Sequence, residues 1–363
     1  MPDEDSARPA LLAAPDAFKG TAGAPALAAA MDRGARRAGW DCDPCPLSDG
    51  GEGFAEVLAQ RRSPSEGSPG SWHRTQVTGP LGEAVVASWW MADGVAVVES
   101  AAASGLPLAG GPEGNDPLRA STRGTGELVA AAVAAGARRV LVGVGGSATT
   151  DGGRGALDAI EAAGGLAGTE VVVACDVETR FVDAAERFGP QKGATPAQVA
   201  ELRDRLAAVA VDLRERYGVD VSVLRGGGAA GGLAGGLAAI GARLVPGFGV
   251  VAESVGFLDR LARVGLVITG EGRLDASSWS GKVVGGVVGS ARRVGVPVLV
   301  VAGAVGPGGI DTEAMGPDVE VISLVDRFGA ARAMGDPARC VEDVVAGALR
   351  ERSPGGGSPL TRK

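Results

Sequence analysis

The sequence predicts an α/β protein built on parallel sheets, and three observations predict it. Short apolar runs rich in β-branched residues recur along the chain, and several are apolar throughout, as strands of a covered parallel sheet are. Ala-rich helical stretches follow most of these runs. Clusters of glycine and aspartate separate strands from helices and predict turns. This alternation is typical of a Rossmann-like sheet with helices on both faces.

The predicted strands, in chain order, are Ala10–Ala14, Ala84–Ala92, Val95–Glu99, Val140–Val144, Val171–Ala174, Leu266–Thr269, Val298–Ala302 and Val319–Leu324. The predicted helices are Ala22–Ala38, Gly51–Gln60, Thr125–Ala135, Asp151–Ala163, Pro196–Tyr217 and Lys282–Arg293. Two segments break the alternation: a polar loop at 61–70, which leads directly into strands, and a Gly/Ala tract at 226–249, predicted as a packed helix pair or a loop. These breaks predict a second, smaller domain inserted into the first.

The composition and charge of the chain argue against binding to nucleic acid or to a membrane. The chain has 35 Lys and Arg against 43 Asp and Glu, a net charge of −8, and 4% aromatic residues. It therefore lacks the basic surface and stacking side chains that nucleic-acid binding needs. The N-terminal MPDEDSARPA has no signal-peptide pattern, and no run reaches the ~18 apolar residues of a membrane span. We expect a cytoplasmic protein that binds neither nucleic acid nor membrane; a homo-oligomer is compatible with the sequence.

The cysteines predict no disulfide framework. Cys42 and Cys45 form a C-x-x-C, but zinc would need two further ligands, and neither His73 nor the remaining cysteines show paired spacing. We expect a structural role for the pair. Because His73 is the single histidine of the chain, mechanisms that need a histidine base are disfavoured.

Open parallel sheets bind ligands beyond the carboxyl ends of their strands, and four polar or glycine-rich clusters fall at such positions. They are residues 14–20 (APDAFKG), 48–53 (SDGGEG), 143–153 (GVGGSATTDGG) and 269–275 (TGEGRLD). The second cluster opens a helix, whose first N–H groups can cradle a phosphate. Taken singly each cluster is typical of a turn, but their shared position indicates a site.

Charged side chains in and beside these clusters favour phosphoryl transfer. The cations are Lys19, Lys192, Arg273 and Lys282, and the carboxylates include Asp49, Asp151, Asp176 and Asp275. Cations neutralise the moving phosphoryl oxygens, carboxylates hold Mg²⁺, and one carboxylate can accept the hydroxyl proton. No G-x-x-x-x-G-K-[ST] occurs, so a Walker loop is excluded.

A nicotinamide-dependent oxidoreductase is the alternative, since Gly143, Gly145 and Ala148 match the G-x-G-x-x-A fingerprint. That fingerprint needs an acidic residue ~20 positions later, at the end of the next strand. Asp176 ends the next predicted strand but lies well beyond that spacing.

Seven ordered motifs resemble those of the bacterial type I glycerate kinases and span about residues 10–350. They are DAFKG at 16–20, SDGGEG at 48–53, GTGE at 124–127, GGSATTDGG at 145–153, CDV at 175–177, FGPQKGA at 188–194 and TGEGRLD at 269–275. The resemblance implies ATP-dependent phosphorylation of D-glycerate with Mg²⁺, usually at the 2-hydroxyl to give 2-phosphoglycerate. It also implies two α/β domains, one flavodoxin-like, with the active site in the cleft between them.

The resemblance and the broken alternation together give the expected domains. The flavodoxin-like domain is expected at 10–70, 117–165 and 262–350, the second domain at 71–116 and 166–261, and disordered ends at 1–9 and 351–363.

Chemistry and position assign roles to the candidate residues. Lys19 and Lys192 are expected to bind the glycerate carboxylate or a phosphate, Arg273 and Lys282 to stabilise the transferring charge, and Asp176 or Asp275 to act as the base. Substrate or nucleotide contacts are expected from Asp16, Asp49, Gly50, Gly51, Glu52, Gly145, Gly146, Ser147, Asp151 and Glu271. Asp49 and Asp151 are the expected metal ligands, and Asp49 with Glu52 binds metal or substrate.

Three departures from the family pattern bear on substrate choice. Residues 178–182 (ETRFV) replace an N-P-L stretch, Thr150 replaces Asn, and Ser277 replaces Gln. If these positions touch the substrate, another small hydroxy acid is accepted; otherwise they are loop changes. A nucleotide-binding regulator without turnover is the third hypothesis.

Overall fold

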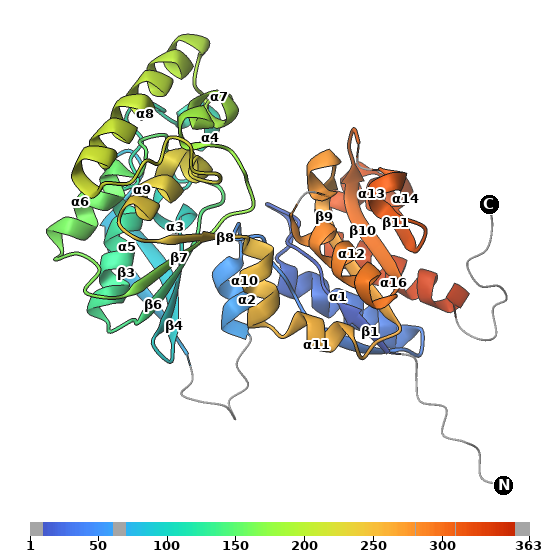
Figure 1. The fold of residues 1–363 in the computed structure, drawn as a ribbon. Coiled ribbons are helices and arrows are strands. Elements are labelled where there is room, and N and C mark those ends of the chain that lie inside the picture. The colour runs from blue at the N-terminus through green and yellow to red at the C-terminus, as the bar shows by residue number, and fades with distance from the viewer. Residues whose placement is uncertain (1–9, 61–69, 280, 309, 353–363) are drawn as a thin grey trace, which may run out of the picture. The chain divides into compact units, whose positions relative to one another are not determined.

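A computed structural model of the chain describes residues 10–60, 70–279, 281–308 and 310–352. These residues form two compact units (Figure 1). Unit 1 comprises the described residues up to Ser48 and from Val251 onward, and unit 2 comprises Asp49–Val250. The predicted loop at 61–69 and the predicted disorder at 1–9 and 353–363 lie outside the described residues.

Unit 1 is built on a parallel sheet. Its strands are β1 (Ala10–Ala13), β2 (Asp41–Pro44), β9 (Leu266–Leu274), β10 (Val298–Val305) and β11 (Val319–Ser323), in the spatial order β11-β10-β9-β1-β2. In the unit's own chain order this reads 5-4-3-1-2, which is the flavodoxin-like arrangement. The central strands are buried and apolar, because helices cover both faces of the sheet.

The helices of unit 1 follow from apolar periodicity. The helical elements are α1 (Ala24–Arg37), α11 (Phe257–Leu261), η4 (Ala276–Trp279), α12 (Val283–Val294), α13 (Thr312–Met315), α14 (Leu324–Phe328), α15 (Ala330–Gly335) and α16 (Pro337–Arg352). Helix α1 has a proline in its first turn and buries Leu27 and Met31 on one face. It packs against α16 in the core of the unit.

Unit 2 is built on a mixed sheet. Its strands are β3 (Ser71–Thr78), β4 (Ala84–Ala92), β5 (Val95–Glu99), β6 (Arg139–Gly143), β7 (Glu170–Ala174) and β8 (Arg243–Val245). Their order across the sheet is the same as their order along the chain. β3, β4 and β5 pair antiparallel, and β5 to β8 pair parallel. The carboxyl ends of β6 and β7 therefore lie side by side.

The helical elements of unit 2 are α2 (Phe54–Gln60), α3 (Ala101–Ser104), α4 (Gly111–Gly114), α5 (Arg123–Ala134), α6 (Arg154–Ala162), η1 (Phe181–Asp183), α7 (Ala184–Phe188), η2 (Pro190–Lys192), α8 (Pro196–Tyr217), η3 (Ala229–Gly232) and α9 (Leu233–Ala239), while α10 (Gly247–Ser254) spans the boundary. Helix α8 begins with a capping box between Thr195 and Gln198 and ends at Gly218, whose φ is 73°. Its buried face packs on Phe181 and Leu157.

All eight predicted strands and all six predicted helices are present, with ends shifted by a few residues. The prediction missed β2, β3 and β8. β2 is a short DCDP edge strand, β3 is half-exposed with alternating polar residues, and β8 has three residues inside the Gly/Ala tract. The rest of that tract is mainly helical, as expected.

The predicted domain boundaries were wrong at several points, among them residues 251–261, which were placed in the second domain but belong to unit 1. Residues 117–165 belong to unit 2, because β6 pairs with β5 and β7. The described residues between Asp49 and Gln60 also belong to unit 2. The inserted unit is the longer one, not the smaller. At the C-terminal end, Glu351 and Arg352 were predicted to be disordered but close α16.

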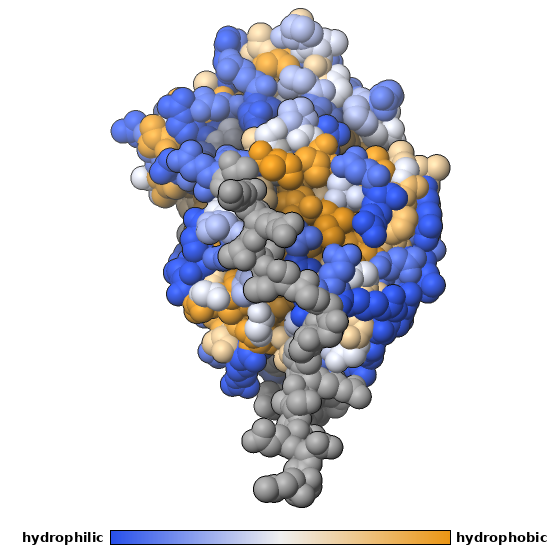
Figure 2. All heavy atoms as spheres, turned by 90° about the vertical axis from the view of Figure 1, so that its right-hand side faces the viewer, coloured by the Kyte–Doolittle hydropathy of each residue, from blue (hydrophilic) through white to orange (hydrophobic). Residues whose placement is uncertain are grey.

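Hydrophobic patches lie between hydrophilic side chains on the face drawn in Figure 2. In unit 1 the exposed large apolar side chains are Leu258, Val294, Ile310 and Met334. Such scattered exposure is ordinary for a globular protein. Within the ranges that the structure describes, no helix is both long enough and apolar enough to cross a membrane.

Candidate functional site

In unit 1 the first and fourth clusters meet at the carboxyl ends of β1 and β9, which pair in parallel. The Asp16 N–H donates to the Gly270 carbonyl at 2.9 Å. A Cβ on Gly272 would lie 3.2 Å from the Cα of Phe18, so glycine permits this close approach. β1 and β9 flank the point where the winding of the sheet reverses, and flavodoxin-like sheets bind ligands at that point.

Glu271 is the central carboxyl of this group. Burial raises its pKa, while a hydrogen bond with Ser278 and the positive charges of Lys282 and Lys19 act in the opposite direction. Its Oε1 is buried and has no hydrogen-bond partner among the described residues. Lys19 itself is exposed. Glu271 thus combines a raised pKa with an oxygen able to accept a proton or a hydrogen bond.

Asp275 and Lys282 are joined through Ser277. The Ser277 N–H and Oγ donate to Asp275 Oδ1 at 2.8 and 2.6 Å, and Lys282 Nζ donates to Ser277 Oγ at 2.8 Å. The hydrogen bond from Ser277 is the main cause of the lowered pKa of Asp275. Arg273 is exposed and its side chain lies against Gly306. A Cβ added to Gly306 would lie 3.0 Å from the Nε of Arg273. Its lowered pKa makes Asp275 a weak base, so it is poorly suited to take a proton near neutral pH.

In unit 2 the second and third clusters form a cradle of backbone. The Gly145 N–H donates to the Gly50 carbonyl at 3.3 Å, and a Cβ on Gly145 would lie 2.6 Å from the Cα of Gly51. Gly50 has φ +87°, and its Cβ would lie 2.8 Å from the Ala174 carbonyl. The glycines are needed for this approach. Because the Gly145 N–H is already used, its predicted contact with a ligand is not supported by this geometry.

Lys192 is the buried cation of unit 2, with 3% of its surface exposed. Its Nζ donates to Ser147 Oγ at 2.9 Å and to the Thr149 carbonyl at 2.6 Å. Burial lowers its pKa to about 7, and the nearby charge of Asp151 opposes the shift. The structure thus brings Lys192 and Ser147 together, and it holds an amine that is ready to gain a proton near neutral pH.

Asn115 is a positioning residue that the sequence analysis missed. Its Nδ2 donates to the carbonyls of Ala148 and Lys192 at 3.0 and 2.9 Å, so it ties the Lys192 turn to the third cluster. Its Oδ1 is buried without a partner among the residues described. An isolated asparagine outside any motif gives no sequence signal for this role.

Two of the predicted carboxylates accept hydrogen bonds from backbone N–H groups at the beginnings of helices. Asp151 Oδ2 accepts from the Thr122 N–H at 2.8 Å, the Thr122 hydroxyl at 2.9 Å and the Gly155 N–H at 3.2 Å, and Oδ1 accepts from the Gly153 N–H at 3.1 Å. Asp176 accepts from the N–H groups of Gly247 and Phe248 at the start of α10, at 2.8 and 3.4 Å. Both carboxylates stabilise helix N-termini.

The remaining candidates of unit 2 lie at the ends of the cradle. Asp49 is half-buried and accepts the Gly51 N–H at 3.0 Å, while Glu52 and Gly146 are exposed. The candidates therefore form two groups. Asp16, Lys19, Glu271, Arg273, Asp275 and Lys282 belong to unit 1, and the others belong to unit 2. Within the described ranges, no three Asp, Glu, His or Cys side chains gather as a metal cluster would.

The family-like GTGE motif and the separate C-x-x-C of Cys42 and Cys45 both have structural surroundings. In GTGE, Glu127 accepts from the Thr78 N–H at 2.6 Å, and a Cβ on Gly126 would lie 2.3 Å from the Ala156 carbonyl. In the C-x-x-C, burial raises the pKa of both thiols to about 12, so neither is a reactive thiolate.

The three departures have different surroundings. In the changed segment after Asp176, Phe181 is fully buried in the core beneath α8, as expected of a loop change. Ser277 contacts two candidate site residues, as described above. Thr150 lines a pocket beside Asp151.

The dinucleotide alternative fails on geometry. A Rossmann fingerprint places its glycines at the turn that opens the helix. Here β6 ends at Gly143, and α6 begins only at Arg154, after a long loop. The N-terminus of the helix is therefore not at the fingerprint.

A flavodoxin-like unit with cations and carboxyls at its ligand edge, joined to a unit with glycine loops and a buried lysine, defines an α/β enzyme for a small anionic substrate. The model of the glycerate kinase family matches residues 11–165 and 161–351. The chain belongs to the glycerate kinase family, and is thus a kinase.

Known proteins are similar over most of their length. The glycerate 2-kinase of Escherichia coli is 37% identical over 81% of this chain and 85% of its own. An uncharacterized protein of Mycobacterium bovis is 43% identical over 81% of this chain and 79% of its own. The crystal structure of a provisionally assigned glycerate kinase 2 from Salmonella typhimurium matches with a TM-score of 0.77 and 33% identity, over 96% of this chain and 99% of that one.

Proposed function

We propose that this protein transfers the γ-phosphoryl group of ATP to the 2-hydroxyl of D-glycerate and forms 2-phosphoglycerate. The observation that carries the proposal is the group of Lys19, Glu271 and Lys282 at the carboxyl ends of β1 and β9. A hydroxy acid needs a cation for its carboxylate and a base for its hydroxyl, and this group offers both. The E. coli relative named glycerate 2-kinase supports the 2-hydroxyl as acceptor.

Glu271 is the base we assign in place of Asp176 or Asp275. It takes the proton of the substrate hydroxyl, the hydroxyl oxygen bonds to the γ-phosphorus, and ADP leaves with the electrons of the broken bond. A raised pKa brings a carboxyl nearer the value that suits a base at neutral pH. Asp176 accepts hydrogen bonds at the start of α10, and the hydrogen bond from Ser277 lowers the pKa of Asp275 and makes it a weaker base.

The remaining cations neutralise charge. Lys19 is assigned to the glycerate carboxylate, and Arg273 and Lys282 to the phosphoryl oxygens, where cations stabilise the charge that the transfer spreads over them. Lys192 contributes a positive charge when an anion nearby raises its pKa again from about 7.

Magnesium is assigned to Asp49 with Glu52. Asp49 Oδ1 accepts a hydrogen bond from the Gly51 N–H, and Glu52 is exposed. Carboxylates in such settings suit Mg²⁺, which keeps several waters and neutralises phosphate charge when bound. The donors around Asp151 already occupy its oxygens, so we do not retain it as a metal ligand.

The test is ADP release from Mg-ATP with a panel of small hydroxy acids, followed by phosphorus NMR of the product. We expect turnover with D-glycerate and a 2-phosphate resonance. Turnover with another acid but not with D-glycerate would contradict the assigned substrate and point to Ser277, the departure that contacts two candidate site residues. ATP binding without turnover on any acid would favour the regulator hypothesis and contradict the proposal.

Glu271→Gln tests the assigned base. Removing a general base lowers kcat by roughly 10²–10⁴-fold, and the isosteric amide preserves the packing. Asp275→Asn is the matched control and should affect kcat less. A larger loss in the control would return the role of base to Asp275.

A further inference from the structure

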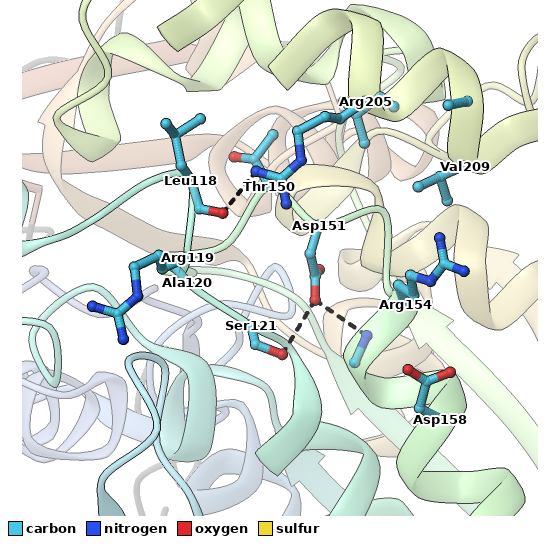
Figure 3. Close-up of a pocket in the computed structure, with 13 residues that line it drawn as sticks. Leu118, Arg119, Ala120, Ser121, Thr150, Asp151, Arg154, Asp158, Arg205 and Val209 are labelled. Carbon is cyan, nitrogen blue, oxygen red and sulfur yellow. Dashed lines mark hydrogen bonds between the residues drawn. The ribbon is translucent and has the colours of Figure 1, made fainter. Parts of the chain in front are cut away.

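A pocket of about 380 Å³ lies within unit 2 beside the end of the third cluster, and neither Lys192 nor the glycines of the cradle line it. Helix α8, the start of α6, the loop after β6 and residues 118–121 surround it (Figure 3). Its volume is at the small end of ligand pockets and suits a metabolite. Nothing in the proposed reaction uses it.

Arginines dominate the charge of this pocket. Arg119, Arg154 and Arg205 line it, each from a different segment, as Figure 3 shows. Arg205 donates one hydrogen bond to the Leu118 carbonyl at 2.7 Å. Arg154 forms an ion pair with Asp212, with 3.6 Å between Nη2 and Oδ2. The Arg119 side chain has no hydrogen bond or ion pair among the described residues. Each guanidinium carries five N–H donors, so most donors remain for a ligand.

The two lining carboxylates do not cancel this charge. Asp151 is committed to the N–H and hydroxyl donors described above, and Asp158 is exposed and stands beside Arg154 in Figure 3. The lining therefore keeps a net positive charge of one, from three arginines and two aspartates.

Thr150 supplies an independent sign of a ligand. It lines the pocket, the residue is 2% exposed, and its Oγ1 is buried and has no hydrogen-bond partner among the described residues. A buried hydroxyl without a partner costs free energy, and a turn of the side chain toward a ligand oxygen in the pocket would remove that cost.

We propose that this pocket is a second ligand site that binds the phosphate group of a small phosphorylated metabolite. Guanidinium groups bind phosphate in a bidentate manner, and three of them around one pocket match a dianion better than a single carboxylate. In this proposal Arg119 and Arg205 donate hydrogen bonds to the phosphate, and the Thr150 hydroxyl forms a hydrogen bond with an oxygen of the ligand. Free inorganic phosphate and a phosphorylated organic acid share this chemistry.

Binding here would act on Lys192. The preceding residue of the loop, Thr149, offers its carbonyl to Lys192 Nζ at 2.6 Å, and the turn that carries Lys192 leads directly into α8. A ligand that bridges Arg205 on α8 and Thr150 on the loop therefore fixes the two segments that hold the lysine. This consequence for activity rests on the proposed function; the binding itself does not.

The test is calorimetric titration of the full chain with inorganic phosphate and, separately, with 3-phosphoglycerate, against potassium chloride at matched ionic strength. We expect saturable binding of at least one, and the tighter of the two identifies the source of the phosphate. Arg119→Gln and Arg205→Gln should each weaken binding about tenfold or more, since each removes a charged hydrogen bond. Thr150→Val should weaken it severalfold with its shape kept.

Arg203→Gln is the matched control, because Arg203 lies on the same helix, is exposed and does not line the pocket. It should leave binding unchanged. Binding no stronger than with chloride would overturn the proposal, as would binding that survives all three pocket variants or is lost equally in the control. Because the Arg119 side chain is exposed and forms no hydrogen bond or ion pair with a described residue, its variant should fold normally. Titration needs no turnover, so failure of kinase activity is a separate result.

Discussion

The candidate residues of the two units are held in place in different ways. In unit 1, charged side chains at the ends of β1 and β9 are positioned by other side chains, as Ser277 positions Asp275 and Lys282. In unit 2, glycine backbone forms the cradle, and one charged side chain, Lys192, is almost completely buried behind it. The unit 1 group is therefore held together by contacts between polar side chains. The cradle of unit 2 instead forms because glycines have no side chains and let backbone segments approach closely.

This difference predicts that substitutions in the two units affect different properties, namely activity in unit 1 and stability in unit 2. A substitution in the unit 1 group removes a charge and leaves the packing intact, so it should change activity without changing stability. A substitution in the glycine cradle forces backbone apart and should change stability first. The predictions below test that division, from the largest expected effect to the smallest.

Gly50→Ala should be the most damaging. At φ +87° a Cβ costs ~1–2 kcal/mol. The contact at 2.8 Å with the Ala174 carbonyl adds an overpacking cost of ~1–3 kcal/mol. Gly20→Ala in unit 1 is the control, since Gly20 has φ +72° but open space around its Cβ. Denaturant unfolding compares them, and equal losses would refute the argument from close approach.

Lys192→Met should lower kcat/KM by up to about a hundredfold, because a charged hydrogen bond to a phosphate or carboxylate is worth ~1.5–3 kcal/mol. Stability should fall little, since losing the bonds to Ser147 and Thr149 is offset by no longer burying an amine. Steady-state kinetics with a thermal melt decide between the roles. A collapsed Tm with normal kcat/KM would make Lys192 structural.

Lys19→Ala should lower kcat/KM about tenfold to a hundredfold, with KM for D-glycerate carrying much of the change. Tm should stay near that of the wild type, because the exposed side chain contributes no buried packing. Arg332→Ala, at an exposed position on α15, is a control that should leave both quantities unchanged. Wild-type kinetics in Lys19→Ala would remove this lysine from the site.

The smallest effect concerns pH. Folding lowers the pKa of Lys192 from 10.5 to about 7, so between these values the unfolded chain holds a proton that the folded chain lacks. The unfolding free energy therefore rises with pH across this window, by about 1.4 kcal/mol per pH unit at most, and the slope disappears below the folded pKa. Lys192→Met should flatten the curve obtained from denaturant unfolding at several pH values. Identical slopes in both proteins would show that burial does not shift this group.

Much of the local structure could be predicted from the sequence, because strand and helix patterns are local. The apolar β-branched runs became strands, and the Thr195 capping box started α8 at the predicted residue. The boundaries of the units could not be predicted in this way. They depend on which strand pairs with which, and the pairing of β6 with β5 and β7 placed residues 117–165 in unit 2.

For the site, sequence alone determined which motifs carry charge and glycine, and the predicted Lys192 and Ser147 do meet in the structure. Only the tertiary structure decided the state of each group. Glu271 has a raised pKa because the fold buries it, Asp151 is committed to helix starts, and Asn115 holds the Lys192 turn from a position far along the chain. Burial and long-range hydrogen bonds arise between segments distant in sequence, so no pattern along the chain encodes them directly.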